Sequence, residues 1–529
     1  MMIKKQRQAL AAVLLGGSLI AAPAFGQSAD DALAVIERAA EALGGVEAIE
    51  NLTSLRMVGY GLTHYQWGGG GLAAPEAPPK WQANNYLQHI WDLENGRYQT
   101  MQRNNFLFPF LAPFGHSFDL VNQVLDGDVA YNISADGSMS RVGFQNPGAL
   151  GTDGVYDRTM WSLTNPVAVV RAALDGEAEV SNLREEDGYQ VVDVTVDAGT
   201  LELAIDDRGF PHHVNWNTAH QNLGEVTYTT NFVGYTEFDG IQLPMGTTTF
   251  LDWRDVLFRA TYADGWIVNG EVEDLAAPEQ IVAANVPVPG VAPLEIEQVA
   301  DRIWRISNGT SVIEFADHLS IYELNGNQLT AQAILDLAQS VNPDKPLTEL
   351  IYSHHHFDHT SGVRVGVAAG LTIIAHAQSE DIFRDMATRP APSFDDVLPE
   401  GGEFRFQGIE EPTDIGDPDF PLVIYPVVGY AHFSEGVFAY QPDSRVMIEG
   451  DLATAADHWQ FWPDTYLNQL EHYGIEVDVV APVHFYTMTH DEIVDFLRPG
   501  IERMHERCET NAEFGNYLAG CPGFIERDW

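Results

Sequence analysis

The stretch Leu350–Gly362, LIYSHHHFDHTSG, constrains this chain more than any other feature, because it places four histidines and one aspartate within six consecutive positions. The chain of 529 residues has only 18 histidines, and a solvated loop has no need of such a density. The residues that lead into the cluster have the apolar pattern of a short buried strand, and the histidines begin where that pattern ends. Side chains at strand ends commonly form the functional site of an α/β domain, which is the architecture that this stretch favours.

Three later segments show the same arrangement, because each follows an apolar strand pattern with a histidine or an aspartate. The runs LVIYPVVGYA, RVMIEG and VDVVAPV lead to His432, Asp451 and His484. Helical patterns such as TAQAILDLAQSV alternate with these strands from about residue 295 onward. Since loops at strand ends converge in such domains, we expect four separated segments to share one rim.

The spacing within the cluster indicates a metal site. Alternate residues of an extended stretch face the same way, so His354 and His356 can reach one metal, while Asp358 and His359 lie past the turn and can reach a second. Imidazole nitrogen and carboxylate oxygen suit Zn²⁺ at about 2.0–2.2 Å, and no cysteine is near enough for a thiolate site. A single histidine would more often be a surface or core residue, but five such side chains at strand ends favour a metal centre.

The segment SHHHFDHTSG resembles the H-x-H-x-D-H signature of the metallo-β-lactamase superfamily, and Gly362 follows it as in that family. His432, Asp451 and His484 then follow in the family's order. The upstream segment VADRIWRISNGTSVIEFADHLSIYELNG resembles the family's opening strands, so the resemblance extends over about residues 295–490. It implies an αββα sandwich with the site on one edge.

The resemblance also implies a role for each ligand position. The ligands would be His354, His356 and His432 for one metal, Asp358, His359 and His484 for the other, and Asp451 as the bridge between them. We expect two Zn²⁺ per chain, with iron or manganese as alternatives, and a metal-bridging hydroxide, because coordination lowers the pKa of water from 15.7 to about 7. Asp358 is the expected catalytic proton acceptor, and His355, which faces the other way, is expected to support or pack against the ligands.

The aspartate at position 451 narrows the range of reactions that the resemblance implies. β-Lactamases of the family have Cys or Ser at the position of Asp451, whereas an aspartate resembles the glyoxalase II, lactonase and phosphodiesterase branches. The prediction is a zinc hydrolase that cleaves an ester, lactone, thioester or β-lactam-type bond of a small-molecule substrate. Three alternatives remain open: a phosphodiesterase or sulfatase, a mononuclear iron oxidoreductase resembling persulfide dioxygenases, and a carrier in which the N-terminal domain holds a lipid-like ligand.

The residues before about position 277 have a different sequence pattern from the α/β domain. The segment DDALAVIERAAEALGGVEAIENL predicts two short helices broken at Gly44-Gly45, and alternating strand-like runs from about Leu55 to Val268 predict a mostly antiparallel sheet. This part resembles the half-barrel of periplasmic lipid-carrier and lipoprotein-sorting proteins. For the aromatic stretch Phe106–Phe114 a buried core is favoured over a ligand site. The predicted fold class is a two-domain α+β protein, with a β-rich domain at 27–276, a linker at 277–294 and the metallo-β-lactamase-type domain at 295–529.

The N-terminus predicts export. Basic residues, an apolar run and a small-residue site form a signal peptide pattern over residues 1–26, and the run is shorter than the 18 or so residues that a membrane span needs. We therefore expect a periplasmic or secreted protein with no integral membrane segment after cleavage, and a disulfide between Cys508 and Cys521. The net charge of −49, from 76 acidic and 27 basic residues, argues against a nucleic-acid partner.

Overall fold

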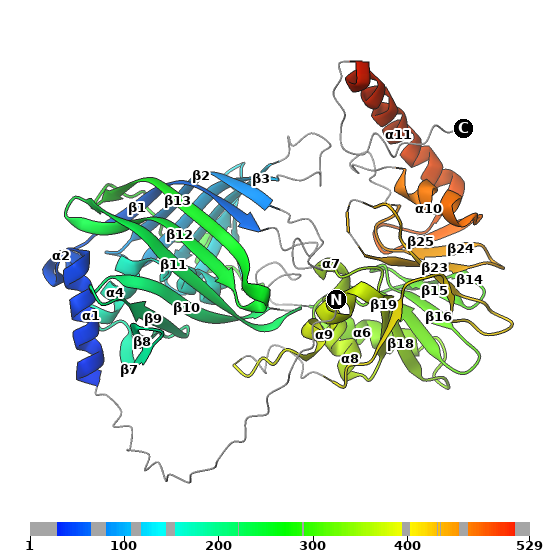
Figure 1. Ribbon diagram of the computed structural model, residues 1–529, viewed down its shortest axis with the longest axis horizontal. Coiled ribbons are helices and arrows are strands. Elements are labelled where there is room, and N and C mark those ends of the chain that lie inside the picture. Colours follow the sequence, from blue (N-terminus) through cyan, green and yellow to red (C-terminus); the bar gives the residue numbers. More distant parts are fainter. Residues whose placement is uncertain are drawn as a thin grey trace, which may run out of the picture.

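The computed structural model describes residues 29–64, 81–106, 118–143, 154–220, 222–287, 290–393, 402–430, 432–433, 435–453 and 464–513. Within these ranges the chain forms one large sheet before residue 269 and two smaller sheets after residue 295 (Figure 1). The predicted signal segment, most of the aromatic stretch 106–114 and Cys521 lie outside the described residues. Cys508 is disulfide-bonded.

The first sheet has thirteen strands in the order β6-β5-β4-β3-β2-β1-β13-β12-β11-β10-β9-β8-β7, and its neighbouring strands are antiparallel. Buried and less buried side chains alternate along strands such as β11, as expected for a sheet with one face packed on a core. The strands are β1 (Ser54–His64), β2 (Trp81–Asp92), β3 (Arg97–Phe106), β4 (Phe118–Asp126), β5 (Val129–Ile133), β6 (Met139–Arg141), β7 (Glu179–Glu186), β8 (Tyr189–Thr195), β9 (Thr200–Ile205), β10 (Pro211–His220), β11 (Gly224–Phe238), β12 (Ile241–Leu251) and β13 (Val256–Val268).

The α-helices among the described residues of this part are α1 (Ala29–Leu43), α2 (Val46–Glu50), α3 (Gly154–Ser162) and α4 (Pro166–Leu174). Helix α1 buries residues at helical spacing and packs against α4 and β7. The predicted break at Gly44-Gly45 is confirmed, since α1 ends and α2 begins there. Gly44 has φ 141°, and a Cβ atom at this position would lie 2.5 Å from the carbonyl oxygen of Gly240, so no larger residue fits.

The remaining strands form a seven-stranded sheet, β14 to β20 in chain order, and a six-stranded sheet, β21 to β26 in chain order. The first sheet of this pair contains β14 (Ile296–Ala300), β15 (Ile303–Ile306), β16 (Ser311–Glu314), β17 (Leu319–Tyr322), β18 (Leu347–Ile351), β19 (Thr372–His376) and β20 (Phe406–Ile409). The second contains β21 (Thr413–Asp414), β22 (Val423–Pro426), β23 (Val437–Gln441), β24 (Val446–Glu449), β25 (Val479–Pro482) and β26 (Met488–Thr489). The helices of this part are α6 (Gln328–Gln339), α7 (Phe357–Thr360), α8 (Val363–Ala368), α9 (Glu380–Thr388), α10 (Thr465–Tyr473) and α11 (His490–Glu513).

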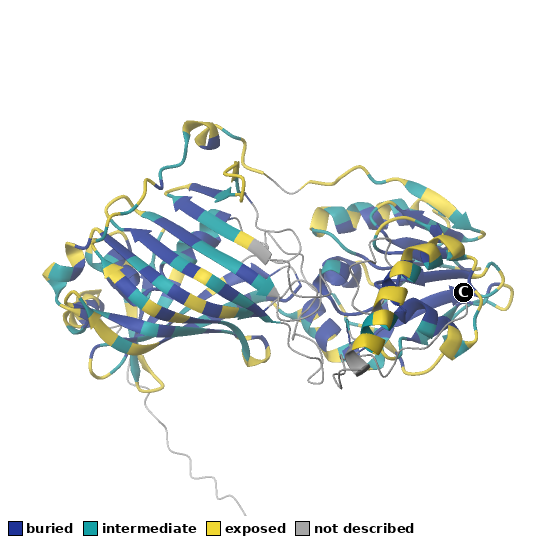
Figure 2. Ribbon diagram, turned by 90° about the horizontal axis from the view of Figure 1, so that it is seen from above, coloured by how far each residue is buried: buried dark blue, intermediate teal, exposed yellow. Residues whose placement is uncertain are grey.

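These elements form four layers. One buried cluster joins the two sheets face to face, with Ile351 from one sheet and Ile448 from the other among its members. Helices α6, α8 and α9 cover the outer face of the first sheet, and α10 and α11 cover that of the second. Figure 2 shows the buried positions concentrated in the strands. The predicted α+β fold class, with an αββα sandwich after a mostly antiparallel β-rich part, is confirmed.

The strand directions explain how the predicted site can assemble. Strands β17 to β20 are parallel to one another, and β24 is parallel to β25. The carboxyl ends of parallel neighbours lie at one edge of a sheet. The histidine cluster follows β18, Asp451 follows β24 and His484 follows β25. All these segments therefore leave their sheets at the same edge of the sandwich.

The two parts of the chain share a buried interface. The connection between β10 and β11 contacts the region of α7 to α9: Asn222 Nδ2 donates to Thr360 Oγ1 at 3.0 Å, and Arg389 Nε donates to the carbonyl oxygen of Leu223 at 3.0 Å. Trp253 Nε1 donates to a carboxylate oxygen of Asp385 at 2.8 Å. One hydrophobic cluster runs through both parts without interruption. The large sheet is therefore packed against the helices that carry the histidine motif.

The connecting segment is partly folded. The stretch predicted as a linker contains a one-turn helix, α5 (Glu279–Val282), whose Ile281 packs in a buried cluster with Ile90 and Tyr131 of the first sheet. The strands of the first sheet end at Val268 and those of the next begin at Ile296, while the domain limits themselves remain a prediction. None of the helices within the described ranges combines the length and apolarity that crossing a membrane requires.

Candidate metal centre

The loop after β18 is held in place by backbone contacts on both sides. The Ser353 N–H donates to Oε1 of Glu323 at 2.8 Å, and the Val437 N–H donates to the Ser353 carbonyl at 2.7 Å. The following residues turn into α7, which begins directly after His356. As a result, the histidines of the motif are buried, with at most 2% of their surface exposed.

The first group of candidate ligands consists of His354, His356, His432 and Asp451, whose ligand atoms all lie within 4.8 Å of one another. Nε2 of His354 lies 2.7 Å from Nδ1 of His356, and Nε2 of His432 lies 2.8 Å from Oδ2 of Asp451. Three imidazoles and one carboxylate thus surround one point.

The second group consists of Asp358, His359 and His484, whose ligand atoms also lie within 4.8 Å of one another. The Nε2 atoms of His359 and His484 are 3.3 Å apart. Oδ2 of Asp358 lies 3.7 Å from the first of these nitrogens and 3.6 Å from the second.

Asp451 connects the groups, because each of its oxygens faces a different one. Oδ2 faces the first group, at 3.4 Å from Nε2 of His354. Oδ1 faces the second group, at 3.3 Å from Nε2 of His359 and 3.2 Å from Nε2 of His484. A carboxylate in this position can ligate two metal ions at once. The structure thus brings all seven predicted ligand positions together, in the two sets that the sequence resemblance implies.

Several supporting residues carry no signal in the sequence. Ser353 Oγ lies 2.9 Å from Nδ1 of His354, which leaves Nε2 of that histidine to face the site, and the ring of Phe433 stacks on His354 with centroids 4.3 Å apart. Oε1 of Glu323 lies 3.6 Å from Nδ1 of His359. The Tyr430 hydroxyl donates to the carbonyl of Asp451 at 2.7 Å. Serine, phenylalanine and tyrosine are common in any core, so only the fold identifies these roles.

His355, the fourth histidine of the cluster, faces away from both groups. Its Nδ1 lies 3.1 Å from Oε1 of Glu435, and both side chains are buried. Gly450 explains how close the strand ends approach each other here: a Cβ atom at this glycine would lie 2.3 Å from Ser353 Oγ. Trp459 and Thr454, which follow Asp451, lie outside the described residues.

The electrostatics of the groups favour bound cations. Burial lowers the pKa of His354 well below its usual value, which keeps this imidazole in the neutral form that binds metals. Burial alone would raise the pKa of Asp451, but the charges of His359 and His484 hold it well below the usual range. Burial likewise would lower the pKa of His484, yet the charge of Asp451 and hydrogen bonds raise it to about 10. Positive charge beside these carboxylates is therefore stabilised.

The donor set fits a divalent metal ion. Oδ1 of Asp358 is buried and has no hydrogen-bond partner among the described residues. This oxygen belongs to the same group as two imidazole nitrogens that lie 3.3 Å apart, an arrangement that a bound cation would stabilise. Imidazole and carboxylate donors without thiolates suit zinc and also iron or manganese. The open side of the site lies at His484, which is 39% exposed, next to Phe485 and Tyr486, which are 50% and 55% exposed.

The comparisons with known proteins concern this part of the chain. Residues 325–496 match the model of the metallo-beta-lactamase superfamily. The chain is 28% identical over 176 residues to the linear primary-alkylsulfatase of Pseudomonas sp, which covers 29% of this chain and 26% of that protein. It is 26% identical over 223 residues to the 2,4-dinitroanisole O-demethylase subunit alpha of Nocardioides sp. (strain JS1661), covering 40% of this chain and 65% of that protein. The chain thus spans about a quarter of the first relative and just under two thirds of the second.

Solved structures with similar folds include the stereoselective inverting sec-alkylsulfatase Pisa1 from Pseudomonas sp., with a TM-score of 0.32 and 18% identity over 45% of this chain and 46% of that one. A metallo-beta-lactamase from Pontibacter korlensis matches with a TM-score of 0.31 and 14% identity, over 39% of this chain and 99% of that one.

Proposed function

We propose, from the premise that its C-terminal domain belongs to the metallo-β-lactamase superfamily, that this chain is an exported hydrolase that uses two zinc ions to cleave an ester-type bond. The observation that carries the proposal is the position of Asp451. Its two carboxylate oxygens face two separate histidine groups, at 2.8 Å on one side and 3.2 Å on the other. A single-metal site would have no use for this arrangement.

The residues of the site have separate roles in binding the two metal ions and in orienting the ligands. His354, His356 and His432 would hold one ion, while Asp358, His359 and His484 would hold the other. When bound, the ions supply Lewis acidity and lower the pKa of a coordinated water to about 7. Ser353 fixes the ring orientation of His354 through Nδ1, and the carboxylate of Glu323 lies 3.6 Å from Nδ1 of His359, where it favours a positive charge on that side.

Asp358 is the residue that accepts the proton of the attacking water. Its Oδ2 approaches the second histidine pair, whereas its Oδ1 has no hydrogen-bond partner among the described residues and can take a proton. The side chain is 18% exposed, so it reaches the open side of the site. The substrate enters there, past His484 and the exposed rings of Phe485 and Tyr486.

Sulfate esters are the substrate class to test first. The alkylsulfatase relative supports this choice, and the O-demethylase relative also acts, by its name, on a carbon–oxygen bond outside the carboxylic esters. The bridging aspartate by itself favours carboxylic esters and lactones, which therefore form the second class. Export is supported by the signal-like pattern of residues 1–26, with periplasm or medium as the destination.

The test combines metal analysis with a substrate panel. We expect about two zinc ions per chain in the wild type and in His472→Ala, an exposed histidine of the same domain, and fewer than two in His356→Ala. The panel contains a primary alkyl sulfate, a carboxylic ester, a lactone, a phosphodiester and an aryl methyl ether. Full metal content and full hydrolysis in His356→Ala would refute the proposal. One iron per chain would instead favour the oxidoreductase alternative.

A further inference from the structure

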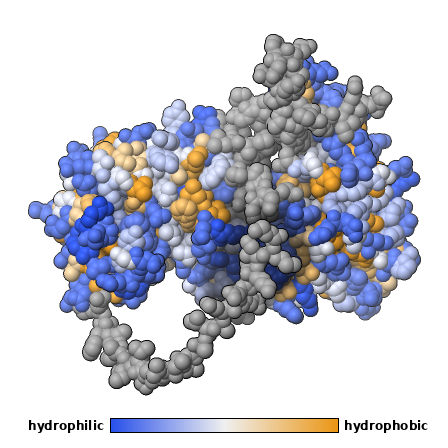
Figure 3. All heavy atoms as spheres, viewed as in Figure 1, coloured by the Kyte–Doolittle hydropathy of each residue, from blue (hydrophilic) through white to orange (hydrophobic). Residues whose placement is uncertain are grey.

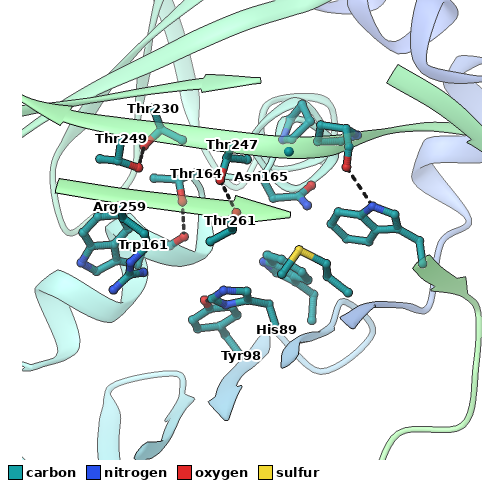
Figure 4. Close-up of a pocket in the computed structure, with 16 residues that line it drawn as sticks. His89, Tyr98, Trp161, Thr164, Asn165, Thr230, Thr247, Thr249, Arg259 and Thr261 are labelled. Atoms are coloured by element: carbon teal, nitrogen blue, oxygen red, sulfur yellow. Dashed lines mark hydrogen bonds between the residues drawn. The ribbon is translucent and has the colours of Figure 1, made fainter. Parts of the chain in front are cut away.

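A second site lies in the β-rich part, between the large sheet and the α3–α4 pair. It is a small cavity of about 40 Å³, and the strands β1 to β3 and β11 to β13 form its floor while Trp161 and Asn165 close it from the helix side (Figure 4). Its lining residues come from positions 57 to 266, so this cavity is separate from the metal centre.

The charge of this cavity differs from that of the rest of the chain. Acidic residues outnumber basic ones by 76 to 27 in the whole sequence. Yet among the 16 described residues that line the cavity there is one guanidinium, Arg259, and no carboxylate. A wall with only positive charge, in so acidic a chain, favours a negatively charged occupant.

Arg259 is half-buried and lacks the carboxylate partner that a cation in such a position normally has. No described carboxylate lies within ion-pair distance of it, and its Nε atom is buried without a hydrogen-bond acceptor. Its guanidinium lies over the rings of Trp161, at 4.6 Å, and Phe258, at 5.6 Å. Burial lowers its pKa, but a guanidinium stays protonated in proteins, so the charge remains. Aromatic faces compensate part of this charge and supply no acceptor for its N–H groups.

Hydroxyl groups complete a polar surface beside this charge. Thr249 is the cross-strand neighbour of Arg259, and Thr247 is that of Thr261, so these side chains share one face of β12 and β13. They form two hydroxyl pairs, Thr230–Thr249 at 2.9 Å and Thr247–Thr261 at 2.5 Å. In each pair only one hydroxyl hydrogen is used between the partners, and the other is left to donate elsewhere.

The helix side adds the positive end of a helix dipole. Asn165 is the N-cap of α4, and its side chain accepts from the N–H groups of Val167 and Ala168, so the positive end of the nine-residue helix points to this wall. His89 contributes no charge, because burial and the neighbouring Arg259 lower its pKa to about 3. The donors around the cavity are thus one cation and several hydroxyls, and the positive end of a helix dipole lies beside them.

We propose that this cavity binds the oxyanion group of a ligand, a carboxylate or sulfate, with Arg259 as the charged partner and the threonine hydroxyls as hydrogen-bond donors. Two sources of such a group are compatible with the surroundings. A free inorganic oxyanion fits the small cavity alone. The head group of an amphiphile would extend its tail past Trp91 and Tyr98, which also line a neighbouring cavity of about 680 Å³ with Leu125 and Leu163 in its wall.

The test measures binding by the full chain through tryptophan fluorescence and thermal unfolding, since Trp91, Trp161 and Trp266 line the cavity. The probes are sodium sulfate, sodium octanoate, and octanamide as the uncharged counterpart of octanoate. Anions that bind at the metal centre are recognised because their share of the response is unchanged in Arg259→Met, a variant of the separate cavity. We expect saturable binding of sulfate, octanoate or both, a Tm raised by about 2 °C or more, and no response to octanamide.

Three variants test whether Arg259 is responsible for the binding of anions in the cavity. Arg259→Met keeps the length of the side chain and removes the charge, and it should weaken anion binding by about tenfold or more without lowering the Tm of the ligand-free protein. Arg208→Gln removes an exposed arginine in the turn between β9 and β10 and should bind as the wild type does. Thr261→Val, which keeps the side-chain volume, should weaken binding and serves as the second test if Arg259→Met does not fold.

The outcomes distinguish a free oxyanion from the head group of an amphiphile, and both from a purely structural role of Arg259. Sulfate binding without octanoate binding assigns a free oxyanion, and preference for octanoate assigns an amphiphile head group. Binding that is equal in the wild type, Arg259→Met and Thr261→Val would overturn the proposal. It would also be overturned if no probe bound and Arg259→Met lowered the Tm, because Arg259 would then be a structural residue held by its stacking on Trp161.

Discussion

Asp451 is the residue on which both histidine groups depend. Because each of its oxygens faces one group, we expect Asp451→Asn to lower the content of both metals and to reduce kcat/KM by about 100-fold or more, although the side chain keeps its size. Elemental analysis and hydrolysis of the best panel substrate check this. Asp414→Asn, at an exposed position of the same domain, is the control. Loss of one metal alone would mean that Asp451 does not bridge.

His89 makes stability depend on pH. Burial and Arg259 lower its pKa from 6.5 to about 3, so the unfolded chain binds this proton more readily than the folded one. The stabilisation is therefore complete above pH 6.5 and is lost as the pH falls toward 3. Between pH 7 and pH 5 the free energy of unfolding should fall by about 2 kcal/mol on account of this group.

His89→Gln should remove that share of the pH dependence, whereas His472→Gln, at an exposed position, should leave it unchanged. Urea unfolding of the three proteins at both pH values measures the difference. Equal slopes in His89→Gln and the wild type would show that His89 titrates in the folded protein as it does in the unfolded one.

At the scale of elements, the connection between β10 and β11 supports the metal motif from outside its own domain. Asn222 Nδ2 donates to Thr360 Oγ1, and that hydroxyl donates to the carbonyl of His356 at 2.9 Å. We expect Asn222→Ala to cost about 1–3 kcal/mol of stability and to weaken metal retention against a chelator. Asn217→Ala, an exposed amide on β10, should change neither. Normal metal retention in a destabilised Asn222→Ala would limit this contact to interdomain packing.

Elements with a strong period could be predicted from sequence, and so could the candidate ligand positions at their ends, which the structure brings together while their role as ligands stays a prediction. The large sheet follows from period-two alternation, as along β11, and the seven ligand positions follow from strand ends and the motif. Asn222, Glu323 and Glu435 could not be predicted, because a single amide or carboxylate has no spacing that links it to a partner. Their roles depend on which surfaces the two parts of the chain bring together, and local patterns do not encode that pairing. For the same reason the helix α5 within the predicted linker could not be predicted, because it depends on the packing of Ile281 against the large sheet.

At the scale of the whole molecule, charge dominates the surface. Figure 3 shows mostly hydrophilic residues on the visible face, with hydrophobic residues in small groups. A net charge of −49 repels itself in the compact state. Raising NaCl from about 10 mM to 300 mM should therefore raise the Tm by about 2–5 °C, since the Debye length shortens from about 30 Å to below 8 Å. KCl at equal ionic strength should act alike, and a Tm that falls with salt would mean that attractive ion pairs outweigh the repulsion.

The order of strands in the large sheet has a consequence for how the chain is made. Strands β1 to β6 and β7 to β13 each join in sequence, and the two series meet only at the pair β1 and β13. Each series can therefore form from local hairpins. The pairing of β1 with β13, in contrast, requires that the last strand of the domain has been synthesised. Until then β1 presents an open strand edge that can pair with other chains. If the chain is exported as proposed, the pairing of β1 with β13 ends the period in which a chaperone is most needed.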